Sequence, residues 1–89
     1  MIEKEITIIN KLGLHARAAA KLVQTANSYA AEVLIRKDGQ EVNGKSIMGV
    51  MMLAASAGTL IQLIIDGEDE QQAMDALVSL IEDRFGEGE

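Results

Sequence analysis

The chain has 89 residues, 48% of them hydrophobic, and a formal net charge of −6, which suits one packed domain with a modest core rather than a disordered tail. It contains no cysteine, so disulfides, thiolate chemistry and cysteine-ligated zinc are excluded. Aromatic residues make up only 2%, and together with the acidic balance this argues against a nucleic-acid partner.

The first half of the chain predicts three strands and one helix. Residues 3–10 include a run of β-branched side chains, which is typical of a strand. After a turn, residues 16–27 repeat apolar side chains at three- and four-residue spacing, which predicts a helix. Residues 32–37 and 40–43 predict two strands, and Asp38-Gly39 between them favours a tight hairpin.

The second half begins with a short helix and a fourth strand. Ser46 follows a loop and is a candidate N-cap for a helix that runs to Ala54 or Ala55. Residues 60–65 predict the strand, and Asp66-Gly67 forms the turn that ends it.

The last helix is the clearest element of the sequence. The acids at 68–70 favour its first turn, and its apolar stripe runs from Ala73 to Ile81. Arg84 is expected in its last turn, and Gly86 is expected to end it before a frayed tail. The acids are explained by the helix start, and no site is assigned to them. The element order β-α-β-β-α-β-α predicts one two-layer α+β domain over residues 1–89, with the sheet on one side and helices on the other.

The charges are distributed unevenly along the chain. Residues 1–65 carry seven basic and five acidic side chains, whereas residues 66–89 carry one basic and nine acidic ones. The mildly basic part suits an acidic protein partner. The N-terminus lacks the pattern of a signal peptide, and no apolar run approaches the length of a membrane span. We therefore expect a cytoplasmic protein without membrane insertion.

The stretch Gly13-Leu14-His15-Ala16-Arg17 lies where the first strand pattern ends and the first helix pattern begins, and it holds the only histidine. A helix start presents unpaired N–H groups and a partial positive charge, which suit a bound anion. His15 is therefore a candidate phosphoryl acceptor, with the guanidinium of Arg17 placed to bind phosphoryl oxygens. The alternatives are a histidine that only caps the helix and an arginine that is only solvated.

Ser46 is the second candidate site. A serine N-cap is ordinary and contributes about 1 kcal/mol, so helix capping alone explains it. A phosphate at this position is also compatible with the helix start and would add negative charge beside a partner surface. Regulatory phosphorylation therefore remains open beside simple capping.

The helix after Ser46 is a candidate docking surface. Its large apolar side chains cannot all face the core in two turns, and methionine is common on surfaces that bind several partners. We expect Val50 and Leu53 to be more buried and three residues to be partly exposed: Ile47, Met48 and Met51. Core packing is the alternative for each. On the first helix, the His15 face extends the patch through Ala16, Ala20 and Gln24.

The element order, the Gly13-Leu14-His15-Ala16-Arg17 motif and the second motif Gly44-Lys45-Ser46-Ile47-Met48-Gly49 together resemble the HPr family. These proteins are the phosphocarriers of the bacterial phosphoenolpyruvate-dependent phosphotransferase systems. The resemblance covers essentially the whole chain. It implies an open-faced sandwich in which three helices lie on one face of a four-stranded antiparallel sheet of order 1-4-2-3.

The resemblance also implies a function. His15 would accept a phosphoryl group on Nδ1 from the phosphohistidine of enzyme I and pass it to an EIIA-type protein, with Arg17 assisting at the phosphoryl oxygens. The helix after Ser46 would contact both partners, and Ser46 matches a serine that a kinase phosphorylates in some members. On this interpretation the protein is a monomeric carrier rather than an enzyme, and it uses no cofactor or metal.

One position departs from the family pattern. Residue 18, which is usually proline, is Ala18 here, and alanine is a strong helix former, so the helix should survive. The alanine-rich run 16–20 is similar to the nitrogen-related branch of the family, while the sugar branch remains the alternative.

Three other functions compete with the carrier. A purely regulatory interaction module would use Ser46 and the methionine surface with His15 idle, but it would need neither His15 nor Arg17. A nucleic-acid binder conflicts with the acidity and the lack of aromatics. A metal site lacks a ligand set, because the chain has one histidine and no cysteine.

Overall fold

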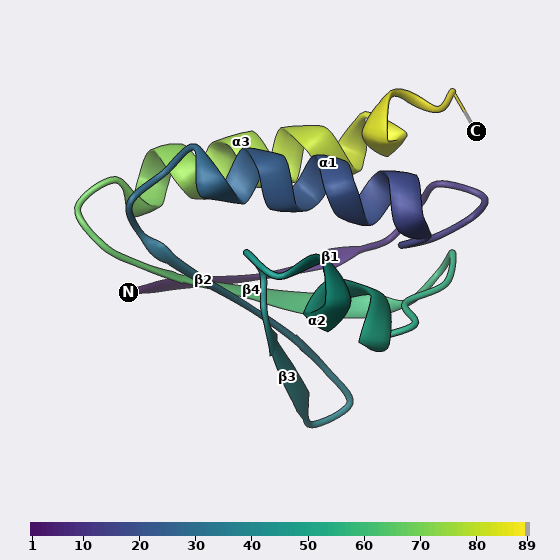
Figure 1. The fold of residues 1–89 in the computed structure, drawn as a ribbon, viewed down its shortest axis with the longest axis horizontal. Coiled ribbons are helices and arrows are strands. Elements are labelled where there is room, and N and C mark those ends of the chain that lie inside the picture. The colour runs from purple at the N-terminus through teal and green to yellow at the C-terminus, as the bar shows by residue number, and fades with distance from the viewer. Residues whose placement is uncertain (89) are drawn as a thin grey trace.

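The computed structural model describes residues 1–88, and its elements follow the predicted order (Figure 1). The short 3₁₀ turn η1 (Arg84–Gly86) follows the last helix. The main elements are β1 (Ile2–Thr7), α1 (Ala16–Asn27), β2 (Glu32–Lys37), β3 (Gln40–Asn43), α2 (Ile47–Met52), β4 (Leu60–Asp66) and α3 (Glu70–Glu82).

The four strands form one antiparallel sheet in the order β1-β4-β2-β3, as the family resemblance implies. β4 lies in the middle, where Ile61 pairs with Ile6 of β1 and Leu63 pairs with Ile35 of β2. The hairpin between β2 and β3 turns through Asp38 and Gly39, which both have positive φ, at +49° and +82°. This is the backbone that a two-residue hairpin of type I′ requires, and it explains the Asp-Gly sequence.

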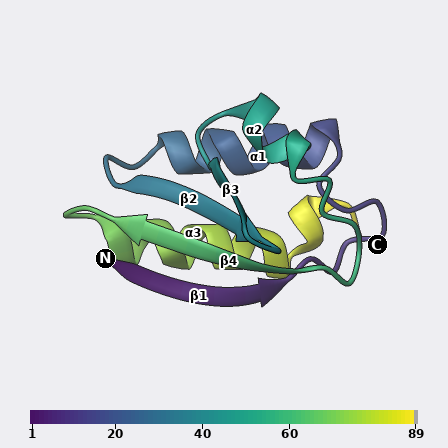
Figure 2. The ribbon, with the colours of Figure 1, turned by 90° about the horizontal axis from the view of Figure 1, so that it is seen from below.

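The helices cover one face of this sheet. α1 and α3 lie side by side over it, and α2 packs beside α1 (Figures 1 and 2). Alternate strand residues and the apolar stripes of α1 and α3 therefore meet in one core. Complete burial of each large aliphatic side chain contributes about 1.5–3 kcal/mol. The largest of these fully buried aliphatic residues are Ile8, Leu22, Ile35, Leu53, Ile61, Leu63, Ile65, Leu77 and Ile81.

Two elements in the first two-thirds of the chain end earlier than the sequence predicts. β1 ends at Thr7 rather than Asn10, although Ile8 still exchanges backbone hydrogen bonds with the segment before β4. α2 ends at Met52 rather than at Ala54 or Ala55. The reason is the left-handed backbone of Ala54, whose φ of +51° cannot continue a right-handed helix.

The start and end of α3 also differ. The helix begins at Glu70, two residues later than the acidic run suggests, and the carboxylate of Asp69 accepts hydrogen bonds from the Ala30 and Ala31 N–H groups instead of capping its own helix. Arg84 does not lie in the last turn of α3, because it already has a left-handed φ of +54° in η1.

Within residues 1–88, the helices are all too short or too polar to cross a lipid bilayer.

Candidate functional site

The loop that carries His15 is fixed by backbone contacts before α1 begins. Gly13 donates to the Asn10 carbonyl at 3.1 Å, and Leu14 donates to the Ala55 carbonyl at 2.8 Å. Gly13 has a φ of +69°, and a Cβ there would lie 2.5 Å from the Ala55 oxygen. The glycine is thus required by both its backbone angle and its closeness to the segment after α2.

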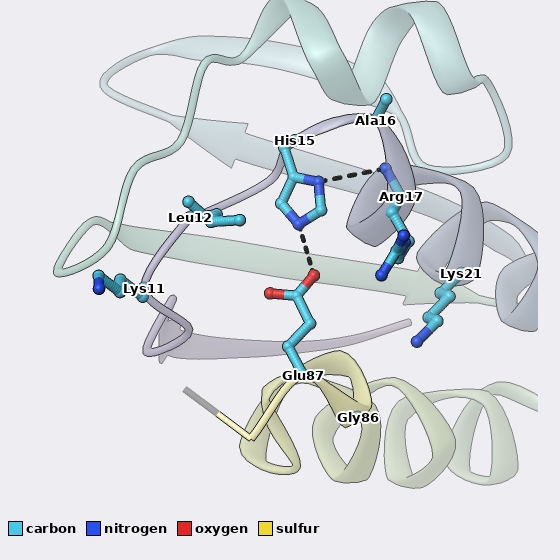
Figure 3. Close-up of a pocket in the computed structure, with 8 residues that line it drawn as sticks. All are labelled: Lys11, Leu12, His15, Ala16, Arg17, Lys21, Gly86 and Glu87. Carbon is cyan, nitrogen blue, oxygen red and sulfur yellow. Dashed lines mark hydrogen bonds and ion pairs between the residues drawn. The ribbon is translucent and has the colours of Figure 1, made fainter.

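His15 is the N-cap residue of α1. Its backbone is extended, and its Nδ1 accepts a hydrogen bond of 3.3 Å from the Arg17 N–H. The other ring nitrogen, Nε2, faces the Glu87 carboxylate in a short contact (Figure 3). The capping role that sequence reasoning kept as an alternative is therefore present. It places Nδ1 at the positive end of the helix, where an anion is favoured.

An open pocket surrounds this imidazole. Arg17 and Lys21 extend from α1 toward the C-terminal turn, and Lys11 comes from the preceding loop (Figure 3). The pocket thus combines three basic side chains with the start of a helix. Such an arrangement suits an anion, which long-range charge and charge-assisted hydrogen bonds stabilise.

The C-terminal turn forms one wall of the pocket. Phe85 is buried with 1% of its surface exposed, and its carbonyl accepts a hydrogen bond of 2.6 Å from Lys21 Nζ. Gly86 and Glu87 line the pocket. The prediction of a frayed tail from residue 86 is therefore wrong for Gly86 and Glu87, while Glu89 lies outside the described residues.

Asn10 connects the tail to the His15 loop. Its fully buried side-chain amide donates to the Gly13 carbonyl at 2.8 Å and to Glu87 Oε1 at 3.0 Å. Burial alone would raise the pKa of Glu87, but the hydrogen bonds from Asn10 and His15 outweigh this and hold the pKa below its ordinary value. Glu87 is therefore ionised beside the imidazole at neutral pH.

Sequence reasoning missed Asn10 and Glu87 as site residues. Asn10 carried only the signal of a turn former, and Glu87 lay between two glycines at the end of an acidic segment. They are separated by 77 positions in the chain, so only the folded backbone brings them together.

Ser46 caps α2, as predicted. Its Oγ accepts a hydrogen bond of 3.1 Å from the Gly49 N–H, and the residue is half-buried. The preceding Lys45 donates through Nζ to the Tyr29 carbonyl at 2.7 Å, which connects this loop to the end of α1.

The predicted docking surface is largely accessible. Ile47, Met48 and Met51 are 45%, 72% and 42% exposed, whereas Val50 and Leu53 are buried, so the expected division is confirmed. Met52 is exposed as well. On α1, Ala16 and Gln24 are exposed and Ala20 is half-buried. We call the residues Ile47, Met48, Met51, Met52, Ala16, Ala20 and Gln24 the α1–α2 patch.

Ala18 and Arg17 occupy contrasting positions in the first turn of α1. Ala18 is fully buried in the core, and α1 forms without the usual proline. Arg17 is exposed, and no acidic residue lies in this first turn to neutralise it.

Metal ligands do not converge here: in the part of the chain that the structure describes, His, Cys, Asp and Glu residues form no group of three or more that could hold a metal ion.

Known proteins match the chain along almost its whole length. Residues 2–83 match the family model for the PTS HPr component phosphorylation site. The phosphocarrier protein HPr of Cupriavidus necator is 58% identical over 89 residues, which covers all of both chains.

Solved structures agree with this assignment. HPr-C-His from Thermoanaerobacter tengcongensis superposes with a TM-score of 0.95 at 50% identity, covering 98% of each chain. An HPr dimer from the same organism has a TM-score of 0.79 at 50% identity and covers 98% of this chain and 100% of its own. The chain therefore belongs to the HPr family of phosphocarrier proteins of the phosphotransferase system.

Proposed function

We propose that His15 is the phosphoryl acceptor of this chain, that enzyme I is the donor, and that an EIIA-type protein receives the group. The observation that carries this proposal is the position of Nδ1 at the N-terminus of α1, inside a pocket with three basic side chains. The family assignment supplies the class of reaction.

The N-terminus of α1 offers hydrogen-bond donors for the phosphoryl oxygens. The Arg17 N–H already donates to Nδ1, and the other N–H groups of the first turn have no partner within the helix. When phosphorus bonds to Nδ1, its oxygens replace the nitrogen lone pair as the acceptor for the Arg17 N–H and lie within reach of the other first-turn donors. The site is complete before the group arrives, so transfer depends on positioning and electrostatics.

Arg17 and Lys21 contribute in different ways. Arg17 is exposed, and its planar guanidinium can donate hydrogen bonds to two phosphoryl oxygens at once during transfer between proteins. Lys21 is half-buried and is already held by the Phe85 carbonyl, so it acts as a fixed point charge. An exposed cation beside the group stabilises it without trapping it, as a carrier requires.

The α1–α2 patch is the surface through which the chain would meet both partners. It has exposed methionine and isoleucine side chains, and it meets the basic pocket at Ala16, which belongs to both. An apolar centre beside a positive rim suits an acidic partner, because charge steers the encounter and apolar burial holds it.

Phosphoryl transfer from labelled phosphoenolpyruvate tests the proposal, with enzyme I added in catalytic amounts. We expect acid-labile, alkali-stable phosphate on the wild-type chain and none on His15→Asn, a variant whose asparagine preserves the helix cap. Equal labelling of the two proteins would exclude His15 as the acceptor. Chasing the label into nitrogen-type and sugar-type EIIA proteins separates the two branches by relative rate.

Ser46 is a second, regulatory candidate. Its Oγ lies at the helix start and its residue is half-buried, so a phosphate there would stay near the helix N-terminus and would place negative charge next to the α1–α2 patch. Mass spectrometry of protein from the native host should detect phosphoserine in residues 46–52. If phosphoserine is absent in all growth conditions, capping alone explains the serine.

We place the carrier in the cytoplasm as a monomer. Because one similar structure is an HPr dimer, light scattering at assay concentration is the direct test of the monomer. A mass near twice 9.6 kDa would contradict it.

A further inference from the structure

We propose that Glu87 is a positioning residue for His15: its carboxylate accepts the Nε2–H and thereby leaves the lone pair on Nδ1 for the phosphoryl group. This inference rests on the proposed function of His15 as phosphoryl acceptor. Glu87 lies beyond residues 2–83, the part that the family model matches.

The hydrogen-bond partners of the ring select one tautomer. A neutral imidazole has one N–H donor and one acceptor nitrogen. The Arg17 backbone N–H can only donate, so Nδ1 must accept. An ionised carboxylate can only accept, so Nε2 must carry the proton that faces Glu87. Both partners therefore favour the same tautomer from opposite sides of the ring (Figure 3).

The carboxylate is held in place by its own neighbours. Asn10 Nδ2 binds the second carboxylate oxygen at 3.0 Å, and only 12% of the Glu87 side chain is exposed. The backbone before it is anchored by the buried Phe85 and by Lys21. Glu87 thus acts as a fixed partner of the ring, like the carboxylates that orient histidine ligands and bases in other proteins.

The geometry keeps the carboxylate away from the bond that forms. Glu87 contacts Nε2, whereas the phosphoryl group would attach to Nδ1 on the other side of the ring. The basic side chains of the pocket offset its charge as a phosphoryl group approaches. Glu87 therefore does not occupy the phosphoryl position.

The transfer step forms one P–N bond and breaks another. The Nδ1 lone pair attacks phosphorus, the P–N bond of the donor phosphohistidine breaks, and its electron pair returns to the donor ring. His15 keeps its Nε2 proton throughout, so its ring becomes cationic as the new P–N bond forms. The positive charge develops next to the Glu87 carboxylate, which stabilises it. When the group moves on to the acceptor, the charge disappears and the original contact remains.

Nitrogen NMR of the full-length ¹⁵N-labelled chain tests the inference directly. At about pH 8.5, where an ordinary imidazole is neutral, the wild type should show a protonated Nε2 and an unprotonated Nδ1. In Glu87→Gln the amide can donate as well as accept, so the signals of both ring nitrogens should move toward a mixture of tautomers. Glu87→Asp should recover part of the wild-type preference.

The same variants are then compared in phosphoryl uptake. We expect Glu87→Gln to be slower on the order of tenfold, as for other residues that orient a functional histidine. Glu82→Gln makes the same chemical change on the exposed end of α3 and should behave as wild type in both measurements.

The two proposals fail in different ways. If Glu87→Gln leaves both ring nitrogen signals unchanged, or if the wild type already carries its proton on Nδ1, the positioning role of Glu87 is wrong and the carrier function is unaffected. If the wild type takes up no phosphate while its tautomer depends on Glu87, the proposed function fails but the positioning contact stands.

Discussion

The carbonyl oxygen of Ala55 lies against the Cα of Gly13, at a separation that leaves no room for a side chain. Through this contact the segment after α2 holds the backbone of the His15 loop in its position relative to the start of α1. The same carbonyl accepts the N–H of Leu14, so one peptide group both excludes a side chain from the loop and binds the next residue of it.

Gly13→Ala should therefore damage stability and function together. The added Cβ would meet the Ala55 oxygen at 2.5 Å, and the residue would be left with a φ of +69°. We expect a loss of roughly 2–4 kcal/mol in the free energy of unfolding, measured by urea denaturation, and slower phosphoryl uptake. Gly58→Ala is the matched control: its φ is +89°, but nothing lies within 4 Å of its new Cβ. If the two variants lost the same stability, the close contact would have no effect.

Phe85→Ala should loosen the C-terminal wall of the pocket. Phe85 is the largest fully buried side chain, and its removal should cost about 3–5 kcal/mol. The contact between Glu87 and His15 should be lost with it, which the ring nitrogen signals of His15 would report. Phe85→Leu retains much of the apolar volume, so it should lose less stability and keep the contact. A Phe85→Ala variant with wild-type ring signals would show that Glu87 is held without this anchor.

The protein should lose stability in acid because protonation of Asp69 removes the contribution of its carboxylate. The hydrogen bond from the Ala30 N–H, with a further one from Ala31, outweighs desolvation and keeps the pKa of Asp69 below its ordinary value of 3.8. A carboxylate with a lowered pKa contributes stability that is fully present above its unfolded pKa and is lost as the pH falls through the folded pKa. The loss should therefore occur below about pH 4.

Urea denaturation of Asp69→Asn between pH 7 and pH 3 measures this contribution. The variant should be less stable than wild type at pH 7, and the difference should shrink as the pH falls. Asp75→Asn, on the exposed face of α3, should follow the wild-type pH dependence. A constant difference between Asp69→Asn and wild type at every pH would show that ionisation of Asp69 does not matter.

Ser46→Ala should cost about 1 kcal/mol of unfolding free energy, because Gly49 loses the side-chain oxygen that accepts its N–H. Ser46→Asp retains an N-cap acceptor and adds favourable charge at the helix start, so its stability should stay near wild type. Thermal unfolding of the three proteins checks the order. If Ser46→Asp unfolds as early as Ser46→Ala, the cap does not account for the effect.

The sequence carries enough local information to predict the sheet, the helices and the position of His15. Periodic apolar residues define α1 and α3, and Asp38-Gly39 defines the hairpin with little dependence on distant contacts. The position of His15 at the start of α1 could be predicted because the residue follows a strand pattern and begins a helix pattern, whereas its role as phosphoryl acceptor is implied by the family resemblance. These features depend on residues close together in the chain, so they can be recognised from short sequence patterns.

Features that depend on distant contacts could not be predicted. The left-handed turn at Arg84 and Phe85 exists because burying the Phe85 ring under α1 and α3 outweighs the cost of the unusual backbone. The early end of α2 depends on Ala54 in the same way. Glu87 joins the site only through this turn, which no local pattern of residues 82–89 indicates.

The two ends of the described chain differ in what could be attached to them without harm. The Met1 ammonium binds the carboxylates of Asp66 and Glu70 (3.3 and 3.1 Å), and the N-terminus lies at the end of the molecule opposite to the start of α1 (Figure 1). Glu87, in contrast, touches the imidazole itself. An affinity tag, fluorophore or fusion partner attached directly behind Glu87 would therefore lie beside the His15 pocket. Labels placed before Met1 would give up one surface ion-pair cluster and leave that site clear.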